Sequence, residues 1–528
     1  MVADIDEFVK PHSVPFPNTL QDKVAFDSVN RRIFIDKRFQ TDHLLLSWQE
    51  RMKTAGNMAY QILPTELDEI VRMRAEGMRV ESVDVDMDMV VRNRAMNYLC
   101  DAARYHASDM HIMLRGTHSE IQIVVNGELR VLARLAQDEG EAMVRSIYQG
   151  IAKIRDDSYK PLEVQNAQIP GDALPTDTCL TSVRIVRGPS YPESAGGAFM
   201  TLRLQYNSAA AHQIKDKKLR ALLHPRSPDG VMRLGKMGFT KSNLSKLELL
   251  MDSPNGIVFF TGPTGSGKTT TLYEVLKELA RRSPEHRQVT IEDPVEYPME
   301  WAVQMNGGSG NEADTGAGYQ EGIRTALRMA PKIIFLGEVR GPSVAEAALQ
   351  AGLTGHKVLT TLHVNDPFQF VERLELMDNV RLNRRVFCDH DSVRGVVAQR
   401  LLPHLCKECS VKLQSKPSLI SKRLSEALSS WGPTDNVRLQ GPGCDHCNHS
   451  GSTSRFSVAE VLVMDERIMN DFIEHGTTVA RKNYRAREGA DPSMLSTSIQ
   501  YALRGFVDPR AVEKNVNLIP MMQGNTHV

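Results

Sequence analysis

The sequence of 528 residues lacks long hydrophobic runs and an excess of charge of either sign. No apolar run approaches the roughly 20 residues that a membrane-spanning helix needs. Lys+Arg and Asp+Glu both number 64, so the formal net charge is +0, and composition gives no support for a nucleic-acid partner. The first residues, MVADIDEFVKPH, are acidic and polar, without the apolar segment of a signal peptide. These absences predict a cytoplasmic protein.

Cysteine is also scarce, and its spacing is informative. Four of the seven cysteines form two C-x2-C pairs, Cys406 with Cys409 and Cys444 with Cys447. In a cytoplasmic chain such pairs favour a metal over disulfides. Four thiolates on two turns suit tetrahedral Zn²⁺, and the thirty-four residues between the pairs predict an elaborated loop. Reduced spectator thiols or a redox pair remain as alternatives.

The most specific single motif is a phosphate loop. Residues 257–260 form a short apolar run typical of a buried strand, GPTGSGKT follows, and residues 270–279 have a helical pattern. Glycines let the backbone turn its N–H groups toward phosphate oxygens, and the helix presents its positive end to the same anion. A chance match in a glycine-rich turn is the alternative, which the flanking strand and helix disfavour. The residues expected to bind nucleotide here are Gly262, Pro263, Thr264, Gly265, Ser266, Gly267, Lys268, Thr269 and Thr270.

Two of these residues have a more specific expected role. Lys268 supplies a point charge for the β- and γ-phosphates, and the Thr269 hydroxyl can complete the shell of a Mg²⁺ ion. Three further apolar runs, in QVTIEDPVEY, KIIFLGEVRG and HKVLTTLHVND, end in carboxylates or histidine. The carboxyl edge of an open parallel sheet is where a ligand binds. Because helical patterns alternate with these runs, the sequence predicts a doubly wound α/β domain.

The chain is long enough for about three domains at the usual size. We expect an N-terminal adaptor or arm over residues 1–89, an α+β domain over 90–210, the nucleotide-binding α/β domain over 211–400, and a mainly helical, cysteine-bearing region over 401–528. Within the second of these, Asn126-Gly127 between two alternating segments predicts a hairpin turn.

The phosphate loop, TIEDPVEY, IIFLGEVR, TGHKVLTTLH and the paired CxxC occur in one order along the chain. In that order, and with ASDMHI ahead of them, they resemble the secretion ATPases that power type II secretion and type IV pilus assembly. The resemblance covers roughly residues 90–510, and the pattern is most similar to the ATPases of type IVB and plasmid-borne thin pili. It does not extend to the first 90 residues.

The resemblance implies a RecA-like ATPase domain in a homohexamer that hydrolyses Mg-ATP. The nucleotide sites would lie at boundaries between subunits. The motor would associate peripherally with the cytoplasmic face of the inner membrane and act on a platform protein there. Paired CxxC motifs favour assembly over retraction.

The resemblance also implies roles for acidic residues. Glu338 would hold Mg²⁺ and Glu296 would polarise the attacking water, while Glu292 and Asp293 would order the site. The family usually has Asp where this chain has Gly341, and Asp-Pro-Asp where this chain has residues 330–332, Ala-Pro-Lys.

Basic residues receive roles in the same way. His356 and His363 would sense or position the γ-phosphate. Arg184 and Arg203 match arginines that reach the nucleotide from the preceding domain; taken alone, they could equally be surface charges on an exposed strand face. The expected cofactors are ATP, Mg²⁺ and Zn²⁺. The alternatives to an assembly or secretion motor are a nucleic-acid translocating or conjugation-type ATPase, a pilus retraction ATPase, and an adaptor that only binds nucleotide.

Overall fold

The computed structural model describes most of the chain. The described residues are 16, 20, 23–27, 32–54, 61–75, 87–207, 219–308 and 315–522. The polar first twelve residues lie outside them, as do residues 309–314 of the glycine-rich stretch 306–318. The chain divides into two compact units, Met1–Asn93 and Arg94–Val528, and the finer division into four domains stays a prediction. No helix in the described residues combines the length and the hydropathy that a bilayer span requires.

The first unit contains a small sheet with its own hydrophobic core. Its elements are β1 (Val24–Asp27), β2 (Arg32–Asp36), α1 (His43–Thr54), β3 (Gln61–Thr65) and α2 (Leu67–Ala75). Strand β2 pairs antiparallel with β1 and parallel with β3. Because side chains alternate along a strand, Ile33 and Ile35 both face inward, where they join Leu45 and Trp48 of α1 in one buried cluster.

The second unit begins with an antiparallel seven-stranded sheet. Its elements are α3 (Met87–Arg104), β4 (Asp109–Leu114), β5 (Ser119–Val125), β6 (Glu128–Leu135), α4 (Gln137–Ser146), β7 (Ile154–Arg155), β8 (Gln165–Pro170), β9 (Leu180–Pro189) and β10 (Ala198–Tyr206). The strand order is β6-β5-β4-β10-β9-β8-β7. Asn126 and Gly127 join β5 to β6 with φ of 53° and 80°. Two left-handed residues are what a tight hairpin turn requires, so the predicted turn is confirmed.

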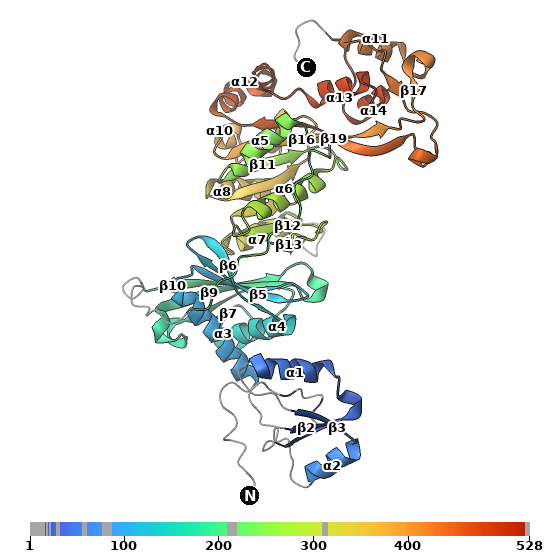
Figure 1. Ribbon diagram of the computed structural model, residues 1–528. Helices are drawn as coiled ribbons and strands as arrows, with labels where there is room; N and C mark the ends of the chain where they lie inside the picture. Colours follow the sequence, from blue (N-terminus) through green and yellow to red (C-terminus); the bar gives the residue numbers. More distant parts are fainter. Residues whose placement is uncertain are drawn as a thin grey trace. The chain divides into compact units, whose positions relative to one another are not determined.

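A second seven-stranded sheet follows in the same unit (Figure 1). Its elements are α5 (Lys241–Asp252), β11 (Gly256–Thr261), α6 (Lys268–Arg282), β12 (Gln288–Glu292), β13 (Ala302–Asn306), α7 (Thr315–Leu327), β14 (Ile333–Leu336), α8 (Pro342–Leu353), β15 (Lys357–Leu362), α9 (Phe370–Glu375), α10 (Arg384–Phe387), β16 (Val393–Leu405) and β19 (Ser452–Val463). The order is β13-β12-β14-β15-β11-β16-β19, with β19 alone antiparallel to its neighbour. This topology confirms the predicted doubly wound, RecA-like P-loop fold.

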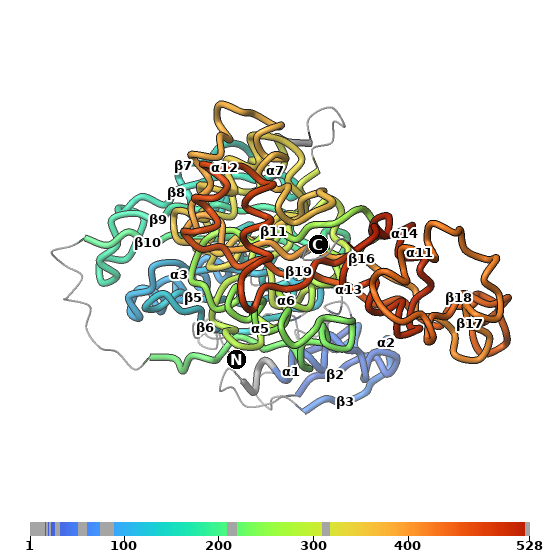
Figure 2. Tube along the Cα trace, turned by 90° about the horizontal axis from the view of Figure 1, so that it is seen from above, coloured from blue at the N-terminus to red at the C-terminus, as the bar shows by residue number. Residues whose placement is uncertain are grey.

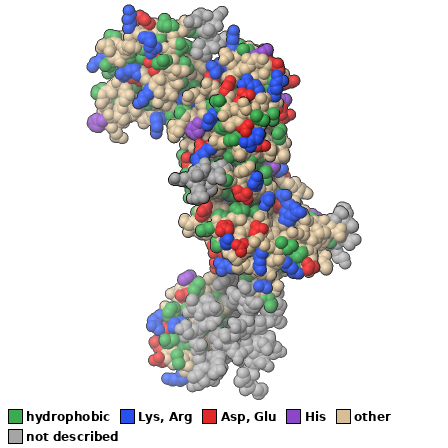
Figure 3. Space-filling view, turned by 180° about the vertical axis from the view of Figure 1, so that it is seen from behind, with side chains coloured by type: hydrophobic (Ala, Val, Ile, Leu, Met, Phe, Trp, Pro, Cys, Tyr) green, Lys and Arg blue, Asp and Glu red, His purple; other side chains and the backbone are tan. Residues whose placement is uncertain are grey.

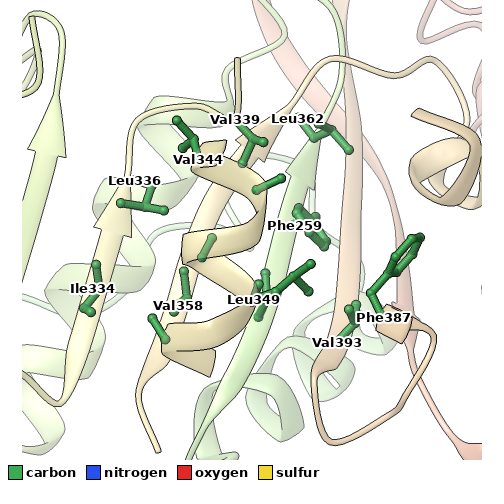
Figure 4. Close-up of a cluster of buried hydrophobic side chains, with 14 of the residues drawn as sticks. Phe259, Ile334, Leu336, Val339, Val344, Leu349, Val358, Leu362, Phe387 and Val393 are labelled. Carbon is green, nitrogen blue, oxygen red and sulfur yellow. The ribbon is translucent and has the colours of Figure 1, made fainter. Parts of the chain in front are cut away.

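The central strand β11 shows why this sheet needs helices on both faces. Its four apolar residues alternate between two cores: Ile257 and Phe259 belong to the core that α8 covers, and Val258 and Phe260 to the core that α6 covers. Figure 4 shows side chains of α8 packed over strands β14, β15 and β11, with Phe259 among them. Each fully buried residue of this type contributes about 1.5–3 kcal/mol.

The last third of the chain is less helical than the sequence predicts. Strands β16 and β19 are 13 and 12 residues long, and they pair antiparallel over most of their length. Strand β16 also runs across position 400, where the sequence predicts a domain boundary. Local patterns miss this pair because about fifty residues separate the two strands, and each is stabilised by the other and by β11.

Beyond this pair lies a small helical body. It contains β17 (Val411–Lys412), α11 (Lys422–Trp431), β18 (Arg438–Leu439), α13 (Met494–Leu503) and α14 (Pro509–Asn515). Both views show these elements gathered beyond the ends of β16 and β19 (Figures 1 and 2). They share one hydrophobic cluster, which includes Leu428, Leu439, Ile499 and Val512. Helix α12 (Glu466–Arg485) packs instead against the hydrophobic core of the second sheet, through Phe472.

The two departures from the family pattern occupy special backbone positions. Gly341 is the N-cap of α8 and offers no side chain for the free N–H groups. Ala330, between α7 and β14, has a φ of 50°, a left-handed conformation that costs an alanine about 1–2 kcal/mol.

We therefore expect Ala330→Gly to stabilise the protein. The strain energy that glycine removes from the folded state is larger than the extra entropic cost of ordering a glycine on folding. The free energy of unfolding should therefore rise by about 0.5–1 kcal/mol. Ala347→Gly, the same change inside α8, should lower it by about 1 kcal/mol. Urea unfolding of both variants measures the two shifts, and a fall for Ala330→Gly would contradict the strain argument.

Candidate functional site

The phosphate loop joins β11 to α6 in a conformation that depends on glycine. Gly262, Gly265 and Gly267 have φ of 149°, 75° and 85°. A Cβ on Gly262 would lie 2.5 Å from Ser266 Oγ and 2.6 Å from the Gln399 carbonyl oxygen, which no real structure tolerates. The loop ends where α6 begins, so free N–H groups and the positive end of the helix dipole are directed at the same place.

Lys268, the first residue of α6, is buried in this loop. Its Nζ donates to the carbonyl oxygens of Gly262 and Pro263 at 2.9 and 3.0 Å. Burial and the nearby Arg400 lower the pKa of Lys268 to about 8, against the opposing charge of Glu296. Lys268 forms no ion pair with a carboxylate in the part of the chain that the structure describes, so an incoming anion would offset the cost of its desolvation.

Strand β16 contributes two residues to this site that the sequence analysis missed. Gln399 follows the last β16 residue paired with β11, and its Nε2 donates to the Ser266 carbonyl at 2.6 Å. Arg400 donates to the carbonyl oxygens of Gln399 and Asn365 at 3.0 and 2.7 Å. Gln399 lies 133 positions from Ser266 in the sequence, so only the pairing of β11 with β16 brings them together.

Acidic residues meet at the same edge of the sheet. Glu338, just after β14, contacts the guanidinium of Arg340 and lies 3.3 Å from Nε2 of His363, which follows β15. Nη1 of Arg340 also lies 3.4 Å from Oδ2 of Asp293, after β12. Burial and the charge of Lys268 lower the pKa of His363. The effect of the Lys268 charge on this pKa indicates that His363 lies near the phosphate loop.

Glu292 and Glu296 occupy different environments. Glu292 is buried, and its Oε1 accepts hydrogen bonds from Thr290 Oγ1 at 2.5 Å and Gln304 Nε2 at 3.0 Å. Burial raises its pKa. Glu296 is exposed, and its negative charge acts on Lys268. Glu292 therefore orders the loop after β12, whereas Glu296 faces the open side of the site.

The remaining residues of the loop are exposed or only partly buried. Pro263 and Thr264 are exposed, and Thr269 is half-buried in the first turn of α6. Thr270 Oγ1 lies 3.0 Å from the hydroxyl of Tyr297. The backbone of this loop is thus accessible to a phosphate chain.

His356 is not brought to this site, which corrects the sequence prediction. It precedes β15, and its carbonyl accepts a hydrogen bond from the N–H of Gly256 at 3.0 Å. That contact lies at the amino ends of β15 and β11, while the phosphate loop lies at their carboxyl ends. A strand of six residues separates the two ends by about 20 Å, so His356 cannot position a γ-phosphate bound in its own chain.

Arg184 and Arg203 are neighbours in the first sheet. They lie directly opposite each other in β9 and β10, and Nε of Arg203 is 2.9 Å from the buried carboxylate of Asp109. Both line a cavity of about 420 Å³ together with Arg328, and no phosphate-loop residue lines it. Within one chain, the structure does not join these arginines to the phosphate loop.

The four cysteines of the CxxC pairs form one cluster between the ends of β16 and β19. Their Sγ atoms all lie within 4.8 Å of one another, with Cys406–Cys444 at 3.7 Å and both Cys409–Cys447 and Cys444–Cys447 at 3.8 Å. A tetrahedron with Zn–S bonds of about 2.3 Å has S–S edges of about 3.8 Å. Burial opposes ionisation of Cys447, but N–H groups of Cys444 and Gly451 bring its pKa down to about 6. The donor set and spacing fit a zinc ion.

A family model described as "Type II/IV secretion system protein" matches residues 218–514, more than half of the chain. The chain belongs to this family. Its match spans the second sheet, the phosphate loop and all four clustered cysteines.

Individual relatives agree with this assignment. The chain is 30% identical to the type II secretion system protein E of Dickeya dadantii over 72% of this chain and 66% of that one. It is 27% identical to the type IV pilus assembly ATPase PilB of Thermus thermophilus over 84% of this chain and 45% of that one. The chain thus spans about half to two thirds of these two curated relatives. A crystal structure of the pilus retraction motor PilT with bound ADP aligns with 79% of this chain and 96% of that chain, at 18% identity and a TM-score of 0.39.

The hydrogen bond from Gln399 predicts a measurable effect on the phosphate loop. Without it the loop loses about 1 kcal/mol of local stability, so Gln399→Ala should speed amide hydrogen exchange across residues 265–268 by roughly fivefold. Gln414→Ala removes a similar side-chain bond far from the loop, to the Thr434 carbonyl, and should leave that exchange unchanged. Equal exchange in both variants would show that Gln399 does not order the loop.

Proposed function

We propose that this chain is the subunit of a hexameric ATPase motor that energises type IV pilus assembly or type II-like secretion at the cytoplasmic face of the inner membrane. One observation supports it above the others. The phosphate loop, with its buried Lys268, lies at the same sheet edge as the carboxylates of Glu338 and Asp293, which Arg340 links. Membership of the type II/IV secretion system family supports a role for this site in secretion or pilus assembly.

The site residues divide the work of hydrolysis. Loop N–H groups hold the β- and γ-phosphates of ATP, and Lys268 exchanges its two carbonyl partners for phosphate oxygens. Glu296, on the open side, accepts a hydrogen bond from the attacking water and directs its oxygen at the γ-phosphorus. Glu338 and Thr269 would hold Mg²⁺, which neutralises charge that develops on the phosphate oxygens. His363, beside Glu338, keeps that carboxylate oriented.

A neighbouring subunit completes this site in the proposal. Arg184 and Arg203 form a basic pair on the first sheet, away from the phosphate loop of their own chain. In a ring they would reach the nucleotide of the next subunit and stabilise charge on its γ-phosphate. Hydrolysis would then release one subunit from the next, and this motion would act on a platform protein in the inner membrane.

The cysteine cluster has a structural role in this proposal. Four thiolates close the coordination shell of Zn²⁺ and leave no position for a reacting water. The ion would fasten the helical body to the ends of β16 and β19. Since β16 also carries Gln399 and Arg400, the helical body and the phosphate loop share one strand. The paired motifs favour an assembly motor over a retraction motor.

The nucleic-acid alternative has less support. On the face seen in Figure 3, Lys and Arg side chains of the described residues are interspersed with Asp and Glu, without the continuous basic track that a single strand would follow. Recovery of a polytopic membrane protein with this chain from native membranes would support the secretion or pilus motor. ATP turnover that is stimulated by single-stranded DNA instead would favour the alternative.

Replacement of Glu338 tests the hydrolytic role. Glu338→Gln should retain ATP binding within a few-fold, because the phosphate loop is intact, and should lower kcat by about a hundredfold or more. The matched control is Glu426→Gln in α11, which should change neither quantity. Steady-state phosphate release and ATP titration measure the two effects, and undiminished turnover in Glu338→Gln would remove the assigned role.

Elemental analysis tests the zinc proposal. Protein purified under reducing conditions should contain about one Zn²⁺ per chain, and Cys406→Ser should lose most of it and unfold more easily. Cys179→Ser, outside the cluster, should keep the full amount. Absence of zinc from the freshly purified, reduced protein would discard the site.

A further inference from the structure

A larger cavity is lined in part by the later turns of α6, away from the proposed ATP site. Its volume is about 660 Å³, within the range of small-molecule sites. Residues 262–270 contribute nothing to its lining. The walls come from β5 and the turn before it in the first sheet, from residues 225–229, from the later turns of α6, and from the chain around the starts of β12 and β13. The residues that carry the argument are Arg115, Gln122, Tyr273, Lys277, Arg287 and Trp301.

Backbone hydrogen bonds hold the two sides of this cavity together. The N–H of Leu129 donates to the Glu285 carbonyl at 3.0 Å, and the N–H of Tyr191 donates to the Gln304 carbonyl at 2.8 Å. The cavity therefore lies between connected parts of one compact unit, and its walls are built before any ligand arrives.

The cavity wall carries a buried positive charge that no ion pair neutralises among the described residues, although the carboxylates of Glu120, Asp229 and Glu300 also line the cavity. Arg287 is 5% exposed; one guanidinium nitrogen donates to Gln122 Oε1 at 2.8 Å, and its Nε has no partner. Neither Arg287 nor Arg115 forms an ion pair with a carboxylate of the described residues. Burial, and then repulsion from Arg115, lower the pKa of Arg287 to about 9. The nearby carboxylate of Glu120 is engaged by Arg134 at 2.9 Å. An anionic ligand would offset this charge.

Aromatic rings form another part of the wall. The ring centroids of Tyr273 and Trp301 are 5.8 Å apart, with 52° between the planes. Lys277 follows Tyr273 by one turn of α6, and a Cβ on Gly230 would lie 3.2 Å from its Nζ. Rings bind planar bases by stacking, while lysine and arginine bind phosphate. We propose that this cavity binds a nucleotide, with its phosphate toward Arg287 and Lys277 and its base against Tyr273 and Trp301.

Occupancy of the cavity is coupled to the ATP site through α6, an inference that rests on the proposed function. Lys268 begins this helix, and Tyr273 and Lys277 lie in its next two turns. Tyr297 connects the two sites a second time: its ring centroid is 5.1 Å from that of Tyr273, and its hydroxyl is 3.0 Å from Thr270 Oγ1. A nucleotide in the cavity is therefore an effector that changes ATP turnover.

Binding is tested on the full-length chain that carries Lys268→Ala, because this substitution weakens nucleotide binding at the phosphate loop. The probes are AMP, GMP and inorganic pyrophosphate, each titrated by calorimetry. At least one monophosphate should bind with a Kd below about 0.1 mM, and pyrophosphate at least tenfold more weakly. Tyr273→Ala with Lys277→Ala should weaken nucleotide binding at least tenfold, whereas Lys412→Ala, a remote exposed lysine, should not. No binding, binding that ignores the double substitution, or pyrophosphate bound as tightly as the nucleotides overturns the proposal.

A fluorescence measurement guards against loss of folding in the double variant. Nucleotide should quench tryptophan emission in the parent protein, and Trp301→Phe, which keeps a ring, should bind within a few-fold and lose most of the quench. A quench that persists without Trp301 overturns the assignment of the base. In the protein with Lys268 intact, the same nucleotide should change ATP turnover at least twofold. Binding without any ATP turnover would refute the proposed motor and the effect on turnover, and would leave the nucleotide-binding cavity standing.

Discussion

The parallel register of the second sheet is the constraint on which the site depends. Thr261 of β11 pairs with Leu362 of β15, Leu336 of β14 pairs with Thr360, and Ile291 of β12 pairs with Leu336. These strands therefore end at one edge. Residues that follow each strand converge there, although more than a hundred positions separate the first from the last. If one strand shifted by two residues, the carboxylate at its end would move by about 7 Å along the strand and would no longer lie beside the phosphate loop.

Lys268 and the described carboxylates at this edge do not pair with one another. Among the described residues, the hydrogen-bond partners of the buried Lys268 are carbonyl oxygens, and burial lowers its pKa to about 8. Across the site, Glu338 is already paired with Arg340 and His363. Cation and carboxylate are kept apart by separate partners, so a negatively charged ligand can approach the lysine without first breaking an ion pair. The cost of desolvating Lys268 is met when the ligand binds.

Strand β16 gives the fold a second kind of connection. Its first half completes the sheet beside β11, Gln399 and Arg400 then support the phosphate loop, and its far end leads into the cysteine cluster. Helix α6 also connects the phosphate loop to a distant region, since it begins at the loop and its later turns line the large cavity. In both cases one rigid element has a residue at the loop and another far from it. A change at either distant position can therefore alter the conformation of the phosphate loop.

The sequence by itself determined the elements whose signals are local. The glycines and lysine of the phosphate loop, the Asn126-Gly127 turn, the apolar runs that became β11, β12, β14 and β15, and the spacing of the cysteine pairs all follow from neighbours in the chain. Tertiary structure alone decided which of these meet. It placed Gln399 beneath the loop and left His356 at the opposite end of β15. It also paired β16 with β19 in a region that reads as helical. The physical reason is that strand pairing and buried charge depend on partners distant in sequence, and local propensity carries no information about those partners.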